Sequence, residues 1–291
     1  MEFGLQIPYG VPAGRDDLKT WITRADAGPF RTVHIGERIT YDNPDQVAVL
    51  AAAAVLTSRV RLLTNVSILP LYAPALLAKA FATIDRLSEG RLIVTPGVGS
   101  RPEDFAAAGK PYDHRWQRLD ECVATMQRLW RGEPAEPSGT ALGPPPFTNG
   151  GPPLHCAATG PKALARAVRW ACGYQGFSAD GNAGAMKHTA DTVTGAFETA
   201  GRPRPELGIT CFFALGDGAL ERLHSVVRRY FGFAPPAVQE AMVDAHKICS
   251  GEAIAEFVAN AGAAGFDEVL FNPTTVEPAE IDRLESVLSN L

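Results

Sequence analysis

Eight short apolar segments alternate along the whole chain with longer segments of helical periodicity, and this alternation constrains the fold more than any other feature. Strands that are separated by helices pair in parallel through right-handed crossovers. Eight such units in 291 residues predict a single-domain (β/α)8, or TIM, barrel over residues 1–291, and a doubly wound open sheet is the alternative. The expected strands are Glu2–Ile7, Thr32–Ile35, Val60–Val66, Leu92–Val98, Leu154–Ala158, Tyr174–Ser178, Leu207–Leu215 and Glu268–Phe271.

The segments between these strands carry apolar residues at helical spacing, and several of them begin with proline. The expected helices are Gly14–Ala27, Pro44–Thr57, Pro74–Leu87, His114–Trp130, Pro161–Ala171, Gly184–Ala200, Ala219–Tyr230 continued to Ile248, Ala253–Ala263 and Pro278–Leu288. The stretch GEPAEPSGTALGPPPFTNGGPP, from Gly132 to Pro153, keeps neither a helical nor a strand period. We therefore expect a long Pro/Gly-rich surface loop between the fourth helix and the fifth strand.

Composition limits the classes of partner. The chain has 27 basic and 32 acidic residues, a net charge of −5 and no long basic run, so we expect it to bind neither nucleic acid nor a membrane surface. No leader-like segment opens the chain and no apolar run reaches about 18 residues, so we expect a cytoplasmic protein. Five widely spaced cysteines and six scattered histidines predict reduced thiols and no metal site.

The residues that follow the strands identify a candidate site, because the carboxyl ends of barrel strands meet on one face. The fourth strand ends in Gly97-Val98-Gly99, which leaves backbone bare for a flat group. The fifth ends in Ala158-Thr159-Gly160-Pro161 at a helix start, where free N–H groups attract phosphate, although an ordinary N-cap explains the same residues. If the two places open toward one cavity, they predict a nucleotide-like cofactor across the barrel mouth.

The chain resembles the bacterial luciferase-like family of flavin- and deazaflavin-dependent oxidoreductases. The resemblance rests on a nearly unbroken block from Thr57 to Trp130, on the run Ala-Thr-Gly-Pro-Lys-Ala-Leu from Ala158, and on AGFDEVLFNP near the C-terminus. It implies a barrel whose mouth binds FMN or the deazaflavin coenzyme F420. The spacing from GVGS to Leu-Trp looks more like the deazaflavin branches, which implies hydride transfer between F420 and a small organic substrate. An FMN-dependent monooxygenase is the alternative.

The resemblance also implies roles for single residues. Thr64, Asn65 and Val66 would lie behind the cofactor ring, with a non-proline cis peptide bond between Asn65 and Val66. Gly97, Gly99 and Ser100 would make room for the cofactor, and the segment from Ala158 through Thr159 and Gly160 to Pro161 would bind its phosphate. Arg101 is a candidate for pairing with a cofactor phosphate or carboxylate, because guanidinium binds such groups with two hydrogen bonds, or else it is a solvated loop arginine.

The end of the second strand departs from the family. Many members carry an acidic residue followed by histidine there, whereas this chain has Glu37-Arg38 with His34 earlier on the strand. His34 and Glu37 are the catalytic candidates, His34 as a proton donor with a near-neutral pKa. The alternatives are a strand histidine that faces the helices and a glutamate in a surface ion pair.

Two further expectations follow from the comparison with the family pattern. The missing acid–histidine pair leaves open a catalytically degenerate barrel that binds a flavin or a partner protein without turnover. Arg101-Pro102 stand where the sugar-phosphate dehydrogenase branch has a glutamate, which disfavours that substrate. Helix faces rich in alanine and leucine, together with the resemblance, suggest a homodimer.

Overall fold

Eight strands form one parallel sheet in the order β5-β3-β2-β1-β12-β11-β10-β9 in the computed structural model, which describes residues 1–135, 139–158 and 160–291. Val94, after β5, pairs in parallel with Leu154, before β9. Val94 N donates to Pro153 O at 3.0 Å and His155 N donates to Val94 O at 2.9 Å, so the two edges of the sheet join. The closed barrel is confirmed and the open sheet is wrong. The strands are β1 Glu2–Gln6, β2 Thr32–Ile35, β3 Arg61–Thr64, β5 Leu92–Ile93, β9 His155–Cys156, β10 Gly173–Phe177, β11 Glu206–Phe213 and β12 Glu268–Pro273.

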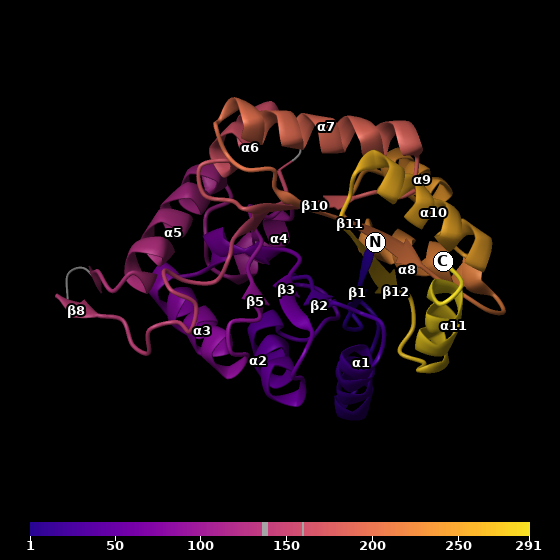
Figure 1. Cartoon of the computed structure of the whole chain (residues 1–291), viewed down its shortest axis with the longest axis horizontal. Helices are drawn as coiled ribbons and strands as arrows, with labels where there is room; N and C mark the ends of the chain where they lie inside the picture. The colour runs from indigo at the N-terminus through magenta and orange to yellow at the C-terminus, as the bar shows by residue number, and fades with distance from the viewer. Residues whose placement is uncertain (136–138, 159) are drawn as a thin grey trace.

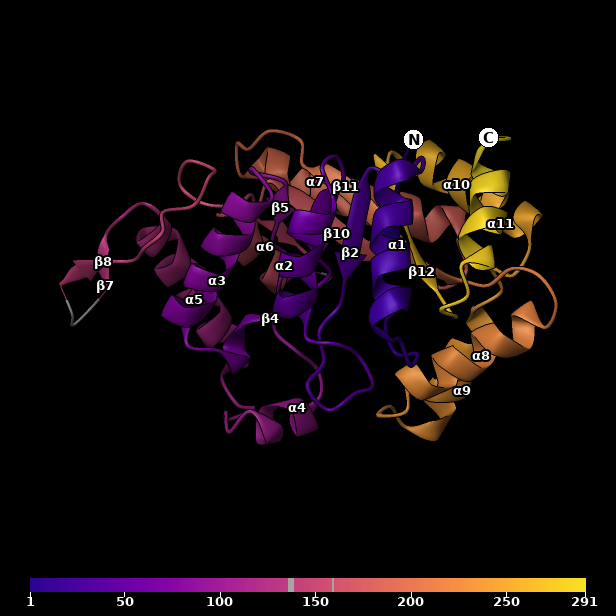
Figure 2. The same cartoon turned by 90° about the horizontal axis from the view of Figure 1, so that it is seen from below.

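Helices surround this barrel as an outer ring (Figure 1). The ring consists of α1 Arg15–Ala27, α2 Gln46–Leu56, α3 Pro74–Leu87, α5 Arg115–Trp130, α6 Pro161–Ala167, α7 Ala183–Thr199, α10 Gly251–Ala264 and α11 Ala279–Leu288. Three further helices lie at one end of the barrel (Figure 2): α8 Ala219–Tyr230 and α9 Pro236–Ala245, which pack on each other, and α4 Pro102–Ala107, which lies apart from them. They follow β6 and β11, so this is the face where the carboxyl ends of the strands meet. No helix of the described residues has the length and apolar character needed to span a bilayer.

The third expected strand ends early, at Thr64, and the fourth is interrupted after Ile93. Each continues after a break as a two-residue strand, β4 Ser67–Ile68 and β6 Pro96–Gly97, and these two pair with each other. The break in the third strand contains a cis peptide bond between Asn65 and Val66, which confirms that prediction. In the Pro/Gly-rich stretch, the described residues include a short hairpin of β7 Pro134–Ala135 and β8 Thr140–Ala141, which the periodicity did not indicate. A 3-10 turn, η1 Leu69–Leu71, follows β4.

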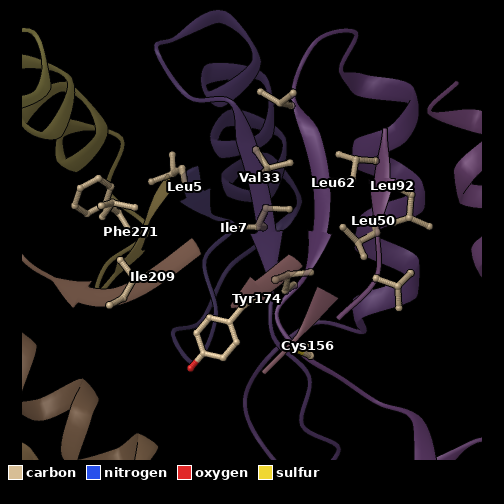
Figure 3. Close-up of a cluster of buried hydrophobic side chains, with 14 of the residues drawn as sticks. Leu5, Ile7, Val33, Leu50, Leu62, Leu92, Cys156, Tyr174, Ile209 and Phe271 are labelled. Atoms are coloured by element: carbon tan, nitrogen blue, oxygen red, sulfur yellow. The ribbon is translucent and has the colours of Figure 1, made fainter. Parts of the chain in front are cut away.

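The main core lies between the barrel and the helix ring, because alternate side chains of each strand point outward. Leu5, Val33 and Leu62 from adjacent strands and Leu50 from α2 belong to this layer, and each is at most 1% exposed (Figure 3). This packing makes a rigid frame for the strand ends.

The interior of the barrel is filled in layers. At the amino ends of the strands, Arg61 forms ion pairs with Glu206 at 2.8 Å and with Glu268 at 2.7 Å. Leu63, Ile93 and Leu270 form a separate buried cluster above them. Polar side chains replace apolar ones toward the carboxyl ends, so the chemistry of the interior is concentrated at the mouth.

Candidate functional site

A cavity of about 640 Å³ lies beside the barrel mouth, between the fourth and fifth strand ends and helices α5 and α6. Gly97 lines one side of it, and Ala158, Gly160 and Pro161 line another. Gly97 and the start of α6 thus line one cavity, but Gly99 is not among its lining residues and Thr159 lies outside the described residues. The remaining lining residues are Pro96, Val98, Trp116, Leu119, Asp120, Cys156, Ala157, Lys162, Ala163, Arg166, Ala167 and Trp170.

The surroundings of the three glycines in this region differ, and so does the reason that each position has no side chain. A Cβ atom on Gly97 would lie 2.4 Å from Val66 Cγ2, and one on Gly99, whose φ is +72°, would lie 2.7 Å from Ile68 Cγ2. Both glycines are thus required by the close packing of the fourth strand end on the third. A Cβ on Gly160 would meet nothing within 4 Å, so the bare backbone at this position faces open space.

The end of the third strand directs one polar side chain toward the barrel interior. Asn65 Nδ2 donates to Thr210 Oγ1 at 3.0 Å and lies 3.5 Å from His34 Nδ1. Thr64 is fully buried, and its hydroxyl accepts from Thr95 N at 2.7 Å. Asn65 therefore connects the second and seventh strands of the barrel across the mouth, whereas the Thr64 hydroxyl bonds to backbone.

His34 is fully buried at the inner end of the mouth. Burial lowers the pKa of His34 to about 3, because water no longer solvates the imidazolium. The expectation of a near-neutral pKa is wrong, and the ring is neutral at physiological pH. His34 Nε2 has no hydrogen-bond partner among the residues that the structure describes.

Glu37 is also buried, with 8% of its surface exposed, and it is not in a surface ion pair. Its carboxylate accepts from Ile68 N at 2.5 Å, from Ser67 Oγ at 3.3 Å and from the Tyr72 hydroxyl. Burial raises the pKa of Glu37, and these hydrogen bonds oppose that rise. The carboxylate thus holds β4, on which Gly97 packs, in its position.

Ser100 and Arg101 lie at the rim of the mouth. The Ser100 carbonyl accepts from the Tyr112 hydroxyl at 3.1 Å. Arg101 Nη1 donates to Thr40 O at 3.3 Å, and its guanidinium carbon lies 5.9 Å from the centroid of the Tyr41 ring. Neither residue is among those that line the cavity.

The family model described as luciferase-like monooxygenase matches residues 1–268. The chain belongs to this family. Among curated proteins, it is 33% identical over 174 residues to an F420-dependent glucose-6-phosphate dehydrogenase from Beutenbergia cavernae, which is 54% of this chain and 51% of that protein. It is 40% identical over 86 residues to an uncharacterized protein of Mycobacterium tuberculosis, which is 30% of each. The matches thus span 30 to 51% of the length of these relatives.

Solved structures of other proteins share the whole fold of this luciferase-like chain. The monooxygenase RslO1 from Streptomyces bottropensis superposes with a TM-score of 0.82 at 21% identity, over 100% of this chain and 98% of that one. An F420-dependent secondary alcohol dehydrogenase, in complex with an F420-acetone adduct, superposes with a TM-score of 0.81 at 18% identity. The superposition covers 98% of this chain and 97% of that one. The oxygenating component of 3,6-diketocamphane monooxygenase from Pseudomonas putida, in complex with FMN, superposes with a TM-score of 0.76 at 17% identity. The superposition covers 99% of this chain and 97% of that one.

Further polar groups of this luciferase-like barrel face the mouth, and two of them, Gln6 and Thr274, were missed from the sequence. Gln6 Oε1, Asn272 Oδ1 and Thr274 Oγ1 are buried and have no partner among the described residues. Gln6 is in register with His34 on the neighbouring strand. Polar residues at inward positions of otherwise apolar strands were the available signal, because a buried polar atom needs a partner.

Aromatic side chains cover the mouth from the side of α8. The ring of Tyr230 lies 5.2 Å from that of Phe212, at the end of β11, and 6.4 Å from that of Tyr9, after β1. Burial raises the pKa of Tyr9 well above its usual value, so its hydroxyl stays protonated. This cover gives the mouth a dry, apolar roof over a polar floor.

Proposed function

We propose that this chain is an oxidoreductase that binds coenzyme F420 at the barrel mouth and transfers a hydride between it and a small organic substrate. The observation that carries the proposal is the cavity that Gly97 and Gly160 share at the carboxyl ends of the strands. The F420-dependent relative, 33% identical over 174 residues, supports the deazaflavin rather than FMN. When bound, the deazaflavin ring supplies the carbon that accepts or releases the hydride.

The residues present fit such a cofactor. His34 Nε2 and Gln6 Oε1 are unpartnered, buried polar atoms at the mouth, and hydrogen bonds to the edge of a heterocyclic ring would satisfy them. The side cavity has room for a tail next to Gly160, and Lys162 brings positive charge to its lining. Arg166 also lines it and pairs there with Asp120 Oδ2 at 3.2 Å. An acidic, phosphate-bearing tail is the group that this arrangement suits.

The chain's own side chains then orient and shield the reacting groups. His34 is neutral, so it offers a hydrogen bond rather than a formal charge. Asn65 is held by Thr210 at 3.0 Å, and its amide is thereby fixed toward the interior. Phe212 and Tyr230 exclude water from above. Glu37 acts as a positioning residue, because its carboxylate holds β4 behind the ring site.

A titration of the purified protein with F420 and, separately, with FMN tests the proposal. We expect F420 to bind more tightly. In the variant Gly160→Leu, the new side chain extends into open space with φ at −96°, so the protein folds but the tail loses its room. We expect F420 affinity to fall by at least about tenfold, which corresponds to about 1.4 kcal/mol.

Gly195→Leu is the matched control, because a Cβ at Gly195, on α7, also meets nothing within 4 Å but lies outside the cavity lining. It should bind F420 like the wild-type protein. Tight binding of FMN without F420 would replace the proposal by an FMN-dependent monooxygenase. Failure of both rings would favour the degenerate barrel.

A further inference from the structure

Arg38 is held by aromatic rings at the rim of the mouth. Its guanidinium carbon lies 3.7 Å from the centroid of the Tyr230 ring, 4.9 Å from that of Tyr41 and 5.3 Å from that of Phe233. Its Nη1 donates to Tyr230 O at 2.8 Å. Stacking and this bond fix the plane of the guanidinium, which leaves its other N–H donors in a defined orientation.

Arg101 reaches the same place from the loop after the fourth strand. Its guanidinium carbon lies 5.9 Å from the ring centroids of both Tyr41 and Phe233, the two rings that also flank Arg38. Arg101 Nε is buried and has no partner among the described residues. Two half-buried cations from different loops therefore converge on one pair of rings.

No ion pair of Arg38 or Arg101 is found in the described part of the chain. Two buried carboxylates lie close to these arginines in the sequence, Glu37 beside Arg38 and Asp104 after Arg101. Glu37 accepts from Ile68 N and the Tyr72 hydroxyl. Asp104 Oδ1 accepts from the backbone N–H groups of Ile39 and Thr40, at 3.1 and 2.8 Å, and from the Thr40 hydroxyl. Its other oxygen, Asp104 Oδ2, is buried and has no partner among the described residues. Neither of these carboxylates forms an ion pair with Arg38 or Arg101 in the described part of the chain, so both guanidinium groups remain without an ionic partner there.

We propose that the substrate of this oxidoreductase bears a carboxylate, which the guanidinium groups of Arg38 and Arg101 bind, with its carbon body against the rings of Tyr41 and Phe233. This inference rests on the proposed function and names its substrate class. Planar guanidinium edges match the two oxygens of a carboxylate. Phe233 is 39% exposed, so an apolar face is available beside the charge. Half-buried cations lose hydration, and an incoming anion compensates for that loss.

Calorimetric titration with phenylacetate and with phenylacetamide tests the inference, because the two probes share one body and differ in charge. We expect the wild-type protein to bind phenylacetate at least about tenfold more tightly than the amide. Arg38→Gln should abolish that preference and Arg101→Gln should reduce it. Arg38→Lys should recover part of it, because the charge returns without the planar donor edge.

Arg169→Gln is the control variant, because Arg169 is exposed in the turn that follows α6 and lies outside the rim. The inference would be overturned if the wild-type protein bound the two probes with equal affinity or bound neither of them. It would also be overturned if the preference for phenylacetate survived in the double variant Arg38→Gln Arg101→Gln. Tighter binding of phenyl phosphate than of phenylacetate would overturn the carboxylate assignment. The titrations use protein without cofactor, and F420 affinity of Arg38→Gln is measured separately. A failure of the proposed F420 binding is thereby distinguished from a failure of the proposed carboxylate binding.

Discussion

Replacement of Gly97 by alanine tests the close packing of the fourth strand end on the third. The added Cβ would lie 2.4 Å from Val66 Cγ2 and 3.0 Å from Val66 Cβ, far inside van der Waals contact. Val66 has little freedom to move away, because its carbonyl accepts from Gln46 Nε2 at 3.1 Å. The following residue is restrained as well, since Ser67 N donates to Thr95 O at 2.9 Å. The clash must therefore be relieved by backbone displacement.

Overpacking of this kind costs about 1–3 kcal/mol, and the restraints on Val66 place the expected loss at about 2 kcal/mol. An unfolding entropy of about 2.1 cal/mol/K per residue gives roughly 0.6 kcal/mol/K for 291 residues. We therefore expect the Tm of Gly97→Ala to fall by about 3 °C.

The assay is urea and thermal unfolding of Gly97→Ala, Val66→Ala and the double variant. Val66→Ala removes the methyl group that clashes, so the double variant should be more stable than the sum of the single effects by about 1–2 kcal/mol. Gly160→Ala, where the new Cβ meets nothing within 4 Å, should leave the free energy of unfolding within about 0.5 kcal/mol of wild type. Strict additivity of the two single variants, or a Gly97→Ala protein as stable as wild type, would refute the packing argument.

Two further expectations concern buried titratable groups. Burial lowers the pKa of His34 to about 3 and that of His155 to about 4, below the 6.5 of the unfolded chain. The unfolded state then binds more protons, so stability is lost as the pH falls below 6.5, by about 1.4 kcal/mol per pH unit for each histidine. Urea unfolding of His155→Gln between pH 7 and pH 5, of which about 1.5 units lie below 6.5, should show a shallower loss of stability than wild type. An identical slope would contradict this expectation. Glu37→Gln should lower the free energy of unfolding by about 1–3 kcal/mol. Ile68 N and the Tyr72 hydroxyl donate to different carboxylate oxygens, and the amide of glutamine has only one oxygen to accept them. An unchanged Tm would contradict this expectation.

The mouth residues show how far the family pattern can be followed. The resemblance correctly predicted the cis bond between Asn65 and Val66, and the order of the strand ends predicted that Gly97 and Gly160 line one cavity. The cofactor roles given to these residues, like the homodimer, stay predictions. The close contact of Gly97 with Val66 was not foreseen, since the sequence contains no measure of the distance between two strand ends.

The sequence by itself determined the barrel, because alternation of apolar strands with amphipathic helices has few other packed solutions and because that pattern is local. Only the tertiary structure decided what the mouth can do. The pKa of His34 depends on the loss of water around it, which the whole barrel causes. The stack of Arg38 on Tyr230 joins residues that are 192 positions apart, and no local pattern specifies such a contact.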